Sequence, residues 1–196
     1  MDWHERRIEP RFNIAPTQEI LTIVQRDDGG RAVQAATWGL VPFWMRDKPK
    51  PVINSRAETV GKSPMFRGTS RCLIPANGFY EWLDKQTPMH IGLKDGGLFA
   101  FAGLWLPGKR DGLPTATILT TQPNELVTTI HNRMPVILRA EDEAAWLDPA
   151  TADPLSLLRP FPAELMRAYA VRPLVNSANN EGPELIEPAE VQQLRF

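Results

Sequence analysis

The chain contains little cysteine and little histidine. Cys72 is the only cysteine among 196 residues, so no disulfide can form within the chain. Three histidines and one cysteine give no cluster with the spacing of a metal site, so we expect neither a metal nor another cofactor. A lone cysteine fits a reducing compartment.

Long apolar runs and the common nucleotide-binding motifs are also absent. No stretch of about 18 apolar residues occurs, so no membrane span is predicted. The first ten residues, MDWHERRIEP, are charged from the second position and lack the apolar core of a signal peptide. None of the motifs G-x-x-x-x-G-K, G-x-G-x-x-G and G-x-S-x-G occurs, so P-loop, dinucleotide-binding and serine-hydrolase sites are not indicated. The simplest location is the cytoplasm.

Size and composition predict one soluble domain. A hydrophobic content of 42% and a charged content of 23% are ordinary for a globular protein, and 196 residues fit one domain over 1–196. The net charge of −1 is unevenly distributed, because residues 43–71 carry seven lysines and arginines against two acidic residues. This segment is either a solvated loop region or a face that binds a polyanion.

Apolar alternation and turn residues predict mostly short strands. A hairpin is expected where strands at 19–25 and 31–38 flank DDGG, and a second where strands at 89–94 and 98–105 flank DGG. The other expected elements are strands at 71–75, 78–83 and 115–121 and short helices at 140–148 and 162–170. Antiparallel strands with a few peripheral helices indicate an α+β or barrel-like fold.

Two titratable side chains are candidate acid–base groups. Glu81 shares one strand face with Phe79 and Leu83, so partial burial would raise its pKa and suit it to proton transfer, unless it is an edge-strand glutamate turned to solvent. His131 lies at a chain reversal and is either a general acid or base or a surface turn residue. Cys72, in an apolar strand, is expected to be a buried hydrophobe rather than a catalytic thiol.

The stretch VINSRAET, residues 52–59, runs from an apolar strand into polar side chains. Asn54 offers both donors and acceptors and Arg56 can grip a phosphate, although Asn54 is equally a turn former. An aromatic segment with basic neighbours precedes this stretch and is typical of a platform for single-stranded nucleic acid, with Trp38, Phe43 and Trp44 as its aromatic residues. Trp38 is as readily a core residue.

Several longer stretches occur in a specific order across nearly the whole chain. They are RFNIAPTQ (11–18), WGLVPFW (38–44), INSRAET (53–59), MFR (65–67), RCLIPANGFYEW (71–82), FAGLW (101–105), ILTT (118–121), IHNRMPVIL (130–138) and VNSANNEGPELIEP (175–188). Together they resemble the SRAP family, the SOS-response-associated peptidases or abasic-site processing proteins. The resemblance implies one α+β domain, mainly antiparallel, with a small closed β-barrel and surrounding helices. It also implies a monomer that binds single-stranded DNA at abasic sites during the response to DNA damage, associated with the nucleoid when bound.

The resemblance further implies a covalent chemistry. Family members expose an N-terminal cysteine by removing their own initiator methionine. Its amine forms a Schiff base with the opened sugar and its thiol then closes a thiazolidine crosslink; a β-elimination (lyase) route is associated with the Schiff base. By matching family positions, Asn54 would hold the N-terminal group and the sugar, Glu81 would carry protons, and His131 would protonate the sugar ring oxygen. The positions that match DNA contacts are Trp38, Phe43, Trp44, Arg56, Arg67, Thr120 and Arg133.

The first residues depart from the family pattern. The chain begins MDWH where the family has Met-Cys-Gly-Arg, and Cys72 cannot substitute because a thiazolidine needs an amine and a thiol on one residue. We expect a natural start upstream that supplies the cysteine together with an N-terminal strand and helix. The alternative is a module that binds abasic sites without trapping them. A general peptidase is disfavoured, because no serine or cysteine nucleophile with an adjacent base occurs.

Overall fold

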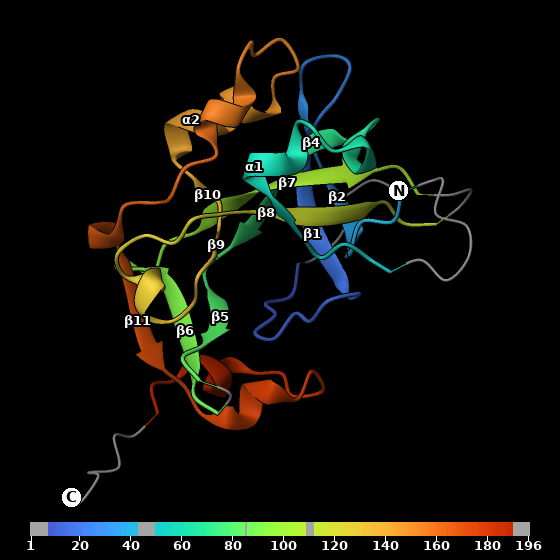
Figure 1. Ribbon diagram of the computed structural model, residues 1–196. Coiled ribbons are helices and arrows are strands. Elements are labelled where there is room, and N and C mark those ends of the chain that lie inside the picture. Colours follow the sequence, from blue (N-terminus) through green and yellow to red (C-terminus); the bar gives the residue numbers. More distant parts are fainter. Residues whose placement is uncertain (1–7, 43–49, 85, 109–111, 190–196) are drawn as a thin grey trace, which may run out of the picture.

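Two β-sheets form most of the structure, and short helices lie around them (Figure 1). The computed structural model describes residues 8–42, 50–84, 86–108 and 112–189. The strands are β1 (Glu19–Gln25), β2 (Arg31–Trp38), β3 (Asn54–Arg56), β4 (Ser70–Ala76), β5 (Phe79–Trp82), β6 (Pro88–Leu93), β7 (Phe99–Leu106), β8 (Thr115–Thr121), β9 (Met134–Pro135), β10 (Ile137–Leu138) and β11 (Met166–Ala170). The α-helices are α1 (Ala57–Val60) and α2 (Ala140–Leu147). Within the described ranges, no helix has the length and apolar character needed to cross a membrane.

Five strands of the larger sheet are hydrogen-bonded to one another in a ring. Its order is β10-β7-β4-β1-β2-β8-β3, with β9 beside β8, and β7 also pairs with β8. Strands β7, β4, β1, β2 and β8 therefore form a closed circuit of hydrogen-bonded neighbours. The predicted hairpin across DDGG is confirmed, with β1 and β2 in register from Glu19 opposite Thr37 to Gln25 opposite Arg31.

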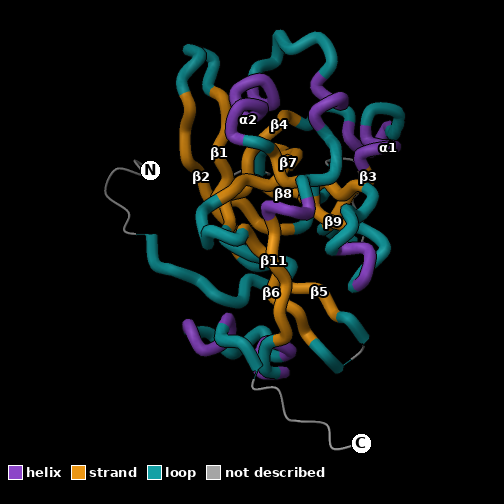
Figure 2. Tube along the Cα trace, turned by 90° about the vertical axis from the view of Figure 1, so that its left-hand side faces the viewer, coloured by secondary structure: helices purple, strands orange, loops and turns teal. Residues whose placement is uncertain are grey.

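Two apolar clusters connect the sheets and helices. The first joins both sheets, since it contains Ile118 of the larger sheet and Ile91 of the smaller one. The second covers the opposite end, where Trp146 and Leu147 of α2 pack against strands of the larger sheet. The predicted helix at 140–148 is thus confirmed, one residue shorter. Both views place α2 at one end of the molecule and the smaller sheet, with the C-terminal segment beside it, at the other (Figures 1 and 2).

The second predicted hairpin is wrong. β6 and β7 follow one another across DGG, but β6 lies in a separate three-stranded sheet of order β11-β6-β5, whereas β7 belongs to the larger sheet. Consecutive strands usually lie side by side, yet a glycine-rich turn also permits a chain to leave one sheet for another. β7 is buried along nearly its whole length, and its partners are β4, β8 and β10. β7 therefore joins the larger sheet, because pairing there with strands that are distant in the sequence buries it.

The predicted helix at 162–170 is also wrong. Only Ala163–Leu165 forms a single 3₁₀ turn, and β11 follows at once. β11 pairs antiparallel with β6 from Met166 opposite Leu93 to Ala170 opposite Met89. Alanine, leucine and methionine favour helices by a few tenths of a kcal/mol each, so the pairing with β6 outweighs that preference.

His90 lies in the middle of the smaller sheet between two tyrosines. Its ring centroid is 5.6 Å from that of Tyr80 and 5.2 Å from that of Tyr169. The residue is 7% exposed, and its Nδ1 atom is buried without a hydrogen-bond partner in the described part of the chain. Burial, together with the positive charge of Arg167, lowers the pKa of His90 to about 4. The sheet is therefore built around a neutral imidazole.

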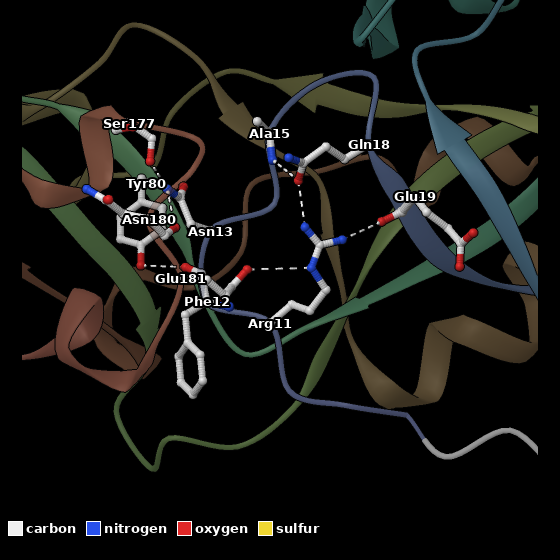
Figure 3. A network of polar contacts seen from close by, with 10 residues as sticks. All are labelled: Arg11, Phe12, Asn13, Ala15, Gln18, Glu19, Tyr80, Ser177, Asn180 and Glu181. Carbon is white, nitrogen blue, oxygen red and sulfur yellow. Dashed lines mark hydrogen bonds and ion pairs between the residues drawn. The ribbon is translucent and has the colours of Figure 1, made fainter.

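The segment before β1 is tied to the C-terminal segment by a network of polar contacts (Figure 3). The buried Asn13 side chain donates its amide hydrogens to backbone oxygens of Val175, Ser177 and Asn180, at 3.2, 2.9 and 3.2 Å. The Tyr80 hydroxyl of β5 donates to the backbone oxygen of Phe12 at 2.8 Å. Both ends of the described chain are thus attached to the smaller sheet.

The depressed pKa of His90 predicts a loss of stability in acid. Between pH 6.5, near the ordinary histidine pKa, and pH 4 the unfolded chain binds a proton that the folded chain does not. The free energy of unfolding should therefore fall as the pH falls through this window, by at most about 3 kcal/mol, since each pKa unit is worth about 1.4 kcal/mol. Urea unfolding at several pH values measures it. His90→Phe should flatten this part of the profile and His131→Gln should retain it; equal profiles for wild type and His90→Phe would contradict the assignment.

Removing the Asn13 amide should destabilise the fold. Asn13→Ala deprives three backbone oxygens of a buried donor, which costs roughly 1–3 kcal/mol. Asn179→Ala, in the same C-terminal segment but exposed, is the matched control and should change stability little. Thermal unfolding of the three proteins makes the comparison, and equal midpoints would show that the network contributes nothing.

Candidate functional site

Strand β3 presents the polar part of VINSRAET along the edge of β8. It pairs parallel with β8, placing Asn54 opposite Ile118 and Arg56 opposite Thr120. The central residue Ser55 is buried, and its Oγ lies 3.0 Å from Oγ1 of Thr117. Because side chains alternate along a strand, Asn54 and Arg56 point to the other face and are exposed. These polar residues lie within a strand rather than beyond its end.

Glu81 and His131 come from different parts of the fold and face each other. Glu81 lies on β5, an edge strand, and its Oε1 atom is 3.9 Å from His131 Nδ1. The Glu81 side chain is 25% exposed and that of His131 is 45% exposed. Burial raises the pKa of the Glu81 carboxyl, and the facing His131 opposes this shift. The sheet edge does not turn Glu81 to solvent, so it is a carboxyl that holds a proton more readily than an exposed one.

The turn that carries His131 offers its ring both a donor and an acceptor. The backbone N–H of Arg133 lies 3.2 Å from Nδ1 of His131, and the backbone oxygen of Arg133 lies 3.1 Å from the same atom. The Nδ1 atom therefore has a partner whether or not it carries a proton. The turn follows a 3₁₀ helix, Val127–Thr129, and leads directly into β9.

Arg133 is engaged by residues of α1 and β8. Its Nη1 and Nη2 atoms donate to the two carboxylate oxygens of Glu58 at 2.6 and 2.9 Å. Nη2 also donates to the backbone oxygen of Thr120 at 2.6 Å. The hydrogen bond from Arg133 is the main cause that lowers the pKa of Glu58. The sequence singled out Arg133 as a phosphate contact but did not single out Glu58, whose partner lies 75 residues away.

Trp38 has the contacts of a structural residue. Its Nε1 atom donates to the backbone oxygen of Ile53 at 2.9 Å, and its ring packs against the first apolar cluster. Its backbone is fixed as well, since its N–H donates to Gln18 and its oxygen accepts from Thr17. The indole thus braces the chain one residue before Asn54. Of the other aromatic candidates, Phe43 and Trp44 lie outside the described residues.

The remaining candidates fall into two groups. Arg56 and Arg67 are exposed, on β3 and after the 3₁₀ turn Pro64–Phe66 respectively, whereas Thr120 is 9% exposed. Among the described residues no group of histidine, cysteine and acidic side chains could hold a metal ion. Cys72 is fully buried in β4, and burial raises the pKa of its thiol far above its usual range, which suits the expected hydrophobic role.

Comparisons with known proteins agree on one family. The sequence model described as SOS response associated peptidase (SRAP) matches residues 1–178. The abasic site processing protein YoqW of Bacillus subtilis (strain 168) is 48% identical over 198 residues, covering 93% of this chain and 88% of that protein. The abasic site processing protein YedK of Escherichia coli (strain K12) is 30% identical over 190 residues, covering 91% and 84%.

Solved structures share the fold. The crystal structure of a protein from Bacteroides thetaiotaomicron matches with a TM-score of 0.71 and 32% identity, covering 92% of this chain and 82% of that one. The crystal structure of a phage-related protein from Bordetella bronchiseptica matches with a TM-score of 0.67 and 30% identity, covering 87% and 86%. The described structure is thus one SRAP-like domain, mostly β with few helices. The chain belongs to the SRAP family of abasic site processing proteins.

Proposed function

We propose that this protein binds single-stranded DNA at abasic sites and reacts with the opened sugar, with Asn54, Glu81 and His131 as its catalytic residues. The observation that carries the proposal is the 3.9 Å approach of Glu81 Oε1 to His131 Nδ1. It places a carboxyl with a raised pKa beside an exposed imidazole, a combination suited to proton transfer near neutrality. The names of the relatives, abasic site processing proteins, support the substrate class.

Each proton of the proposed reaction has a donor or acceptor. His131 gives a proton to the ring oxygen of the abasic sugar, the hydroxyl on the anomeric carbon gives its proton to Glu81, and the carbon–oxygen bond of the ring breaks to leave an aldehyde. The N-terminal amine adds to the aldehyde carbon, and its surplus proton returns to His131, which gives a neutral carbinolamine. Glu81 then protonates the carbinolamine hydroxyl, water leaves, and the nitrogen returns a proton to the Glu81 carboxylate as the carbon–nitrogen double bond forms. In a form with an N-terminal cysteine, the thiol adds across this bond, its sulfur to the carbon and its proton to the nitrogen, and closes a thiazolidine. The exposed amide of Asn54 holds the reacting groups.

The DNA contacts in this proposal follow the exposed basic and aromatic residues. Arg56, beside Asn54, is the best placed of the described arginines to meet a phosphate near the lesion, since it is exposed on the same strand. The further contacts expected from the sequence are Arg67, Thr120, Arg133, Trp38, Phe43 and Trp44. Of these, Arg67 is exposed, whereas Trp38 is held by Ile53 and the Arg133 side chain by Glu58. The closed circuit of strand pairings supports interpreting the larger sheet as the small barrel that supports this face.

Trapping with borohydride tests the proposed chemistry. The protein is incubated with a single-stranded oligonucleotide that carries one abasic site, any imine is reduced, and the product is resolved on a denaturing gel. Glu81→Gln and His131→Gln should each lower the initial rate at least about tenfold, because each removes an acid–base group. Asp142→Asn, on α2, breaks a 2.7 Å ion pair with Arg159 and should leave the rate unchanged. A wild type that gives no product, or equal product with an intact strand, would contradict the covalent mechanism.

Salt dependence tests the alternative of a module that binds without reacting. Both functions need phosphate contacts, so affinity for the abasic strand should fall steeply as salt rises. Arg56→Gln should reduce the slope of log affinity against log salt by about 0.7, the value of one contact to a single strand. Arg159→Gln is the control, because the Arg159 side chain pairs with Asp142 of α2 and not with a candidate site residue. Salt-dependent binding without trapped product favours the non-covalent module, and an unchanged slope in Arg56→Gln removes Arg56 from the interface.

A further inference from the structure

One ion pair joins three separate parts of the candidate site. Glu58 lies in the first turn of α1, directly after β3, and holds both Nη atoms of Arg133. Arg133 lies in the turn after His131, and its Nη2 atom also donates to Thr120 of β8. The pair therefore connects the element that carries Asn54 with the turn that carries His131.

The Arg133 side chain is anchored rather than extended into solvent. Its side chain is 16% exposed, against 45% for that of Glu58. Its Nε atom is buried and has no hydrogen-bond partner among the described residues. The two carboxylate oxygens of Glu58 occupy the planar fork that an arginine would otherwise offer to a phosphate. A guanidinium this covered needs its counter-ion, because an uncompensated buried charge is strongly destabilising.

The anchored side chain constrains the partners of His131. The backbone N–H and the backbone oxygen of Arg133 both lie within 3.2 Å of His131 Nδ1. On its other side, the turn is fixed by β9, where Pro135 lies opposite Thr120. Holding the Arg133 side chain against Thr120 thus limits the motion of the backbone that faces the imidazole.

We propose that Glu58 is a positioning residue of the site: its carboxylate clamps Arg133 against Thr120 and thereby fixes the turn that presents His131 to Glu81. The proposal rests on the proposed function for its catalytic consequence, although the clamp itself is a property of the free protein. Glu58 does not touch the reacting atoms; it acts through Arg133.

The distribution of charge supports this role. The positive groups that act on Glu58 are Arg133 and Arg56, whereas the group that acts on Glu81 is His131. Glu58 therefore neutralises Arg133, with which it forms an ion pair, whereas Glu81 faces the imidazole of His131.

Nuclear magnetic resonance of the free protein tests the clamp without any DNA. The His131 ring nitrogens are identified by their loss in His131→Gln. In Glu58→Ala, the Nδ1 resonance should move toward its value in the urea-unfolded chain, and Glu58→Asp, which keeps a carboxylate, should restore part of the wild-type value. Asp142→Asn removes a comparably short arginine pair elsewhere and should leave the resonance in place. An unchanged His131 resonance in Glu58→Ala overturns the proposal, and Glu58→Gln provides the same reading if the alanine variant does not fold.

Kinetics with an abasic strand test the consequence. At saturating DNA, Glu58→Ala should slow the trapped reaction at least about tenfold, since small displacements of a catalytic group cost factors of this size or more. Its affinity for the strand should stay equal or become tighter, because a negative charge is removed from a phosphate-binding face. Tighter binding with an unchanged rate would show that Glu58 merely competes with phosphate for Arg133 and overturns the proposal. If wild type itself gives no product, the proposed function fails, and the resonance measurement still decides on the clamp.

Discussion

The arrangement of the site depends on one buried strand, β8, which has partners along both edges. Its first half pairs with β2 on one edge and β7 on the other, and its second half pairs with β3 and β9. Thr120 is the point where these meet, opposite Arg56 on one edge and Pro135 on the other. Because strand register is fixed wherever both sides are buried, the strand of Asn54 and the turn of His131 are set relative to each other.

Glu81 reaches this position from the smaller sheet, so its place depends on how the two sheets pack. On one side of β5, Phe79 meets Phe101 of the larger sheet edge to face, with centroids 5.9 Å apart. On the other side, Tyr80 donates to Phe12, whose neighbour Asn13 holds the C-terminal segment. Fixing β5 and the segments around it costs conformational entropy. The contacts of Phe79, Tyr80 and Asn13, which lie outside the site, offset that cost. Segments that carry none of the candidate site residues thereby determine the approach of Glu81 to His131.

Local patterns in the sequence predicted the elements whose partners are near in the chain. The hairpin of β1 and β2, strand β8 and helix α2 are all confirmed, because alternation, turn residues and first-turn acids act over a few residues. The hairpin of β6 and β7 and the helix at 162–170 are wrong, because β6, β7 and β11 take distant partners. The sequence could nominate Glu81 and His131 singly, whereas their 3.9 Å approach depends on the packing of the two sheets.

The same limit explains the residue that sequence reasoning missed. Within VINSRAET, Asn54 and Arg56 are recognisable by their type, while Glu58 resembles an ordinary acid in the first turn of a helix. Its role follows from Arg133, which is largely covered and needs a counter-ion. One short segment thus supplies an exposed amide, an exposed cation and the anion that neutralises a covered cation. Because the Glu58 carboxylate is bound to Arg133, Arg56 is the one of these two arginines whose side chain stays exposed.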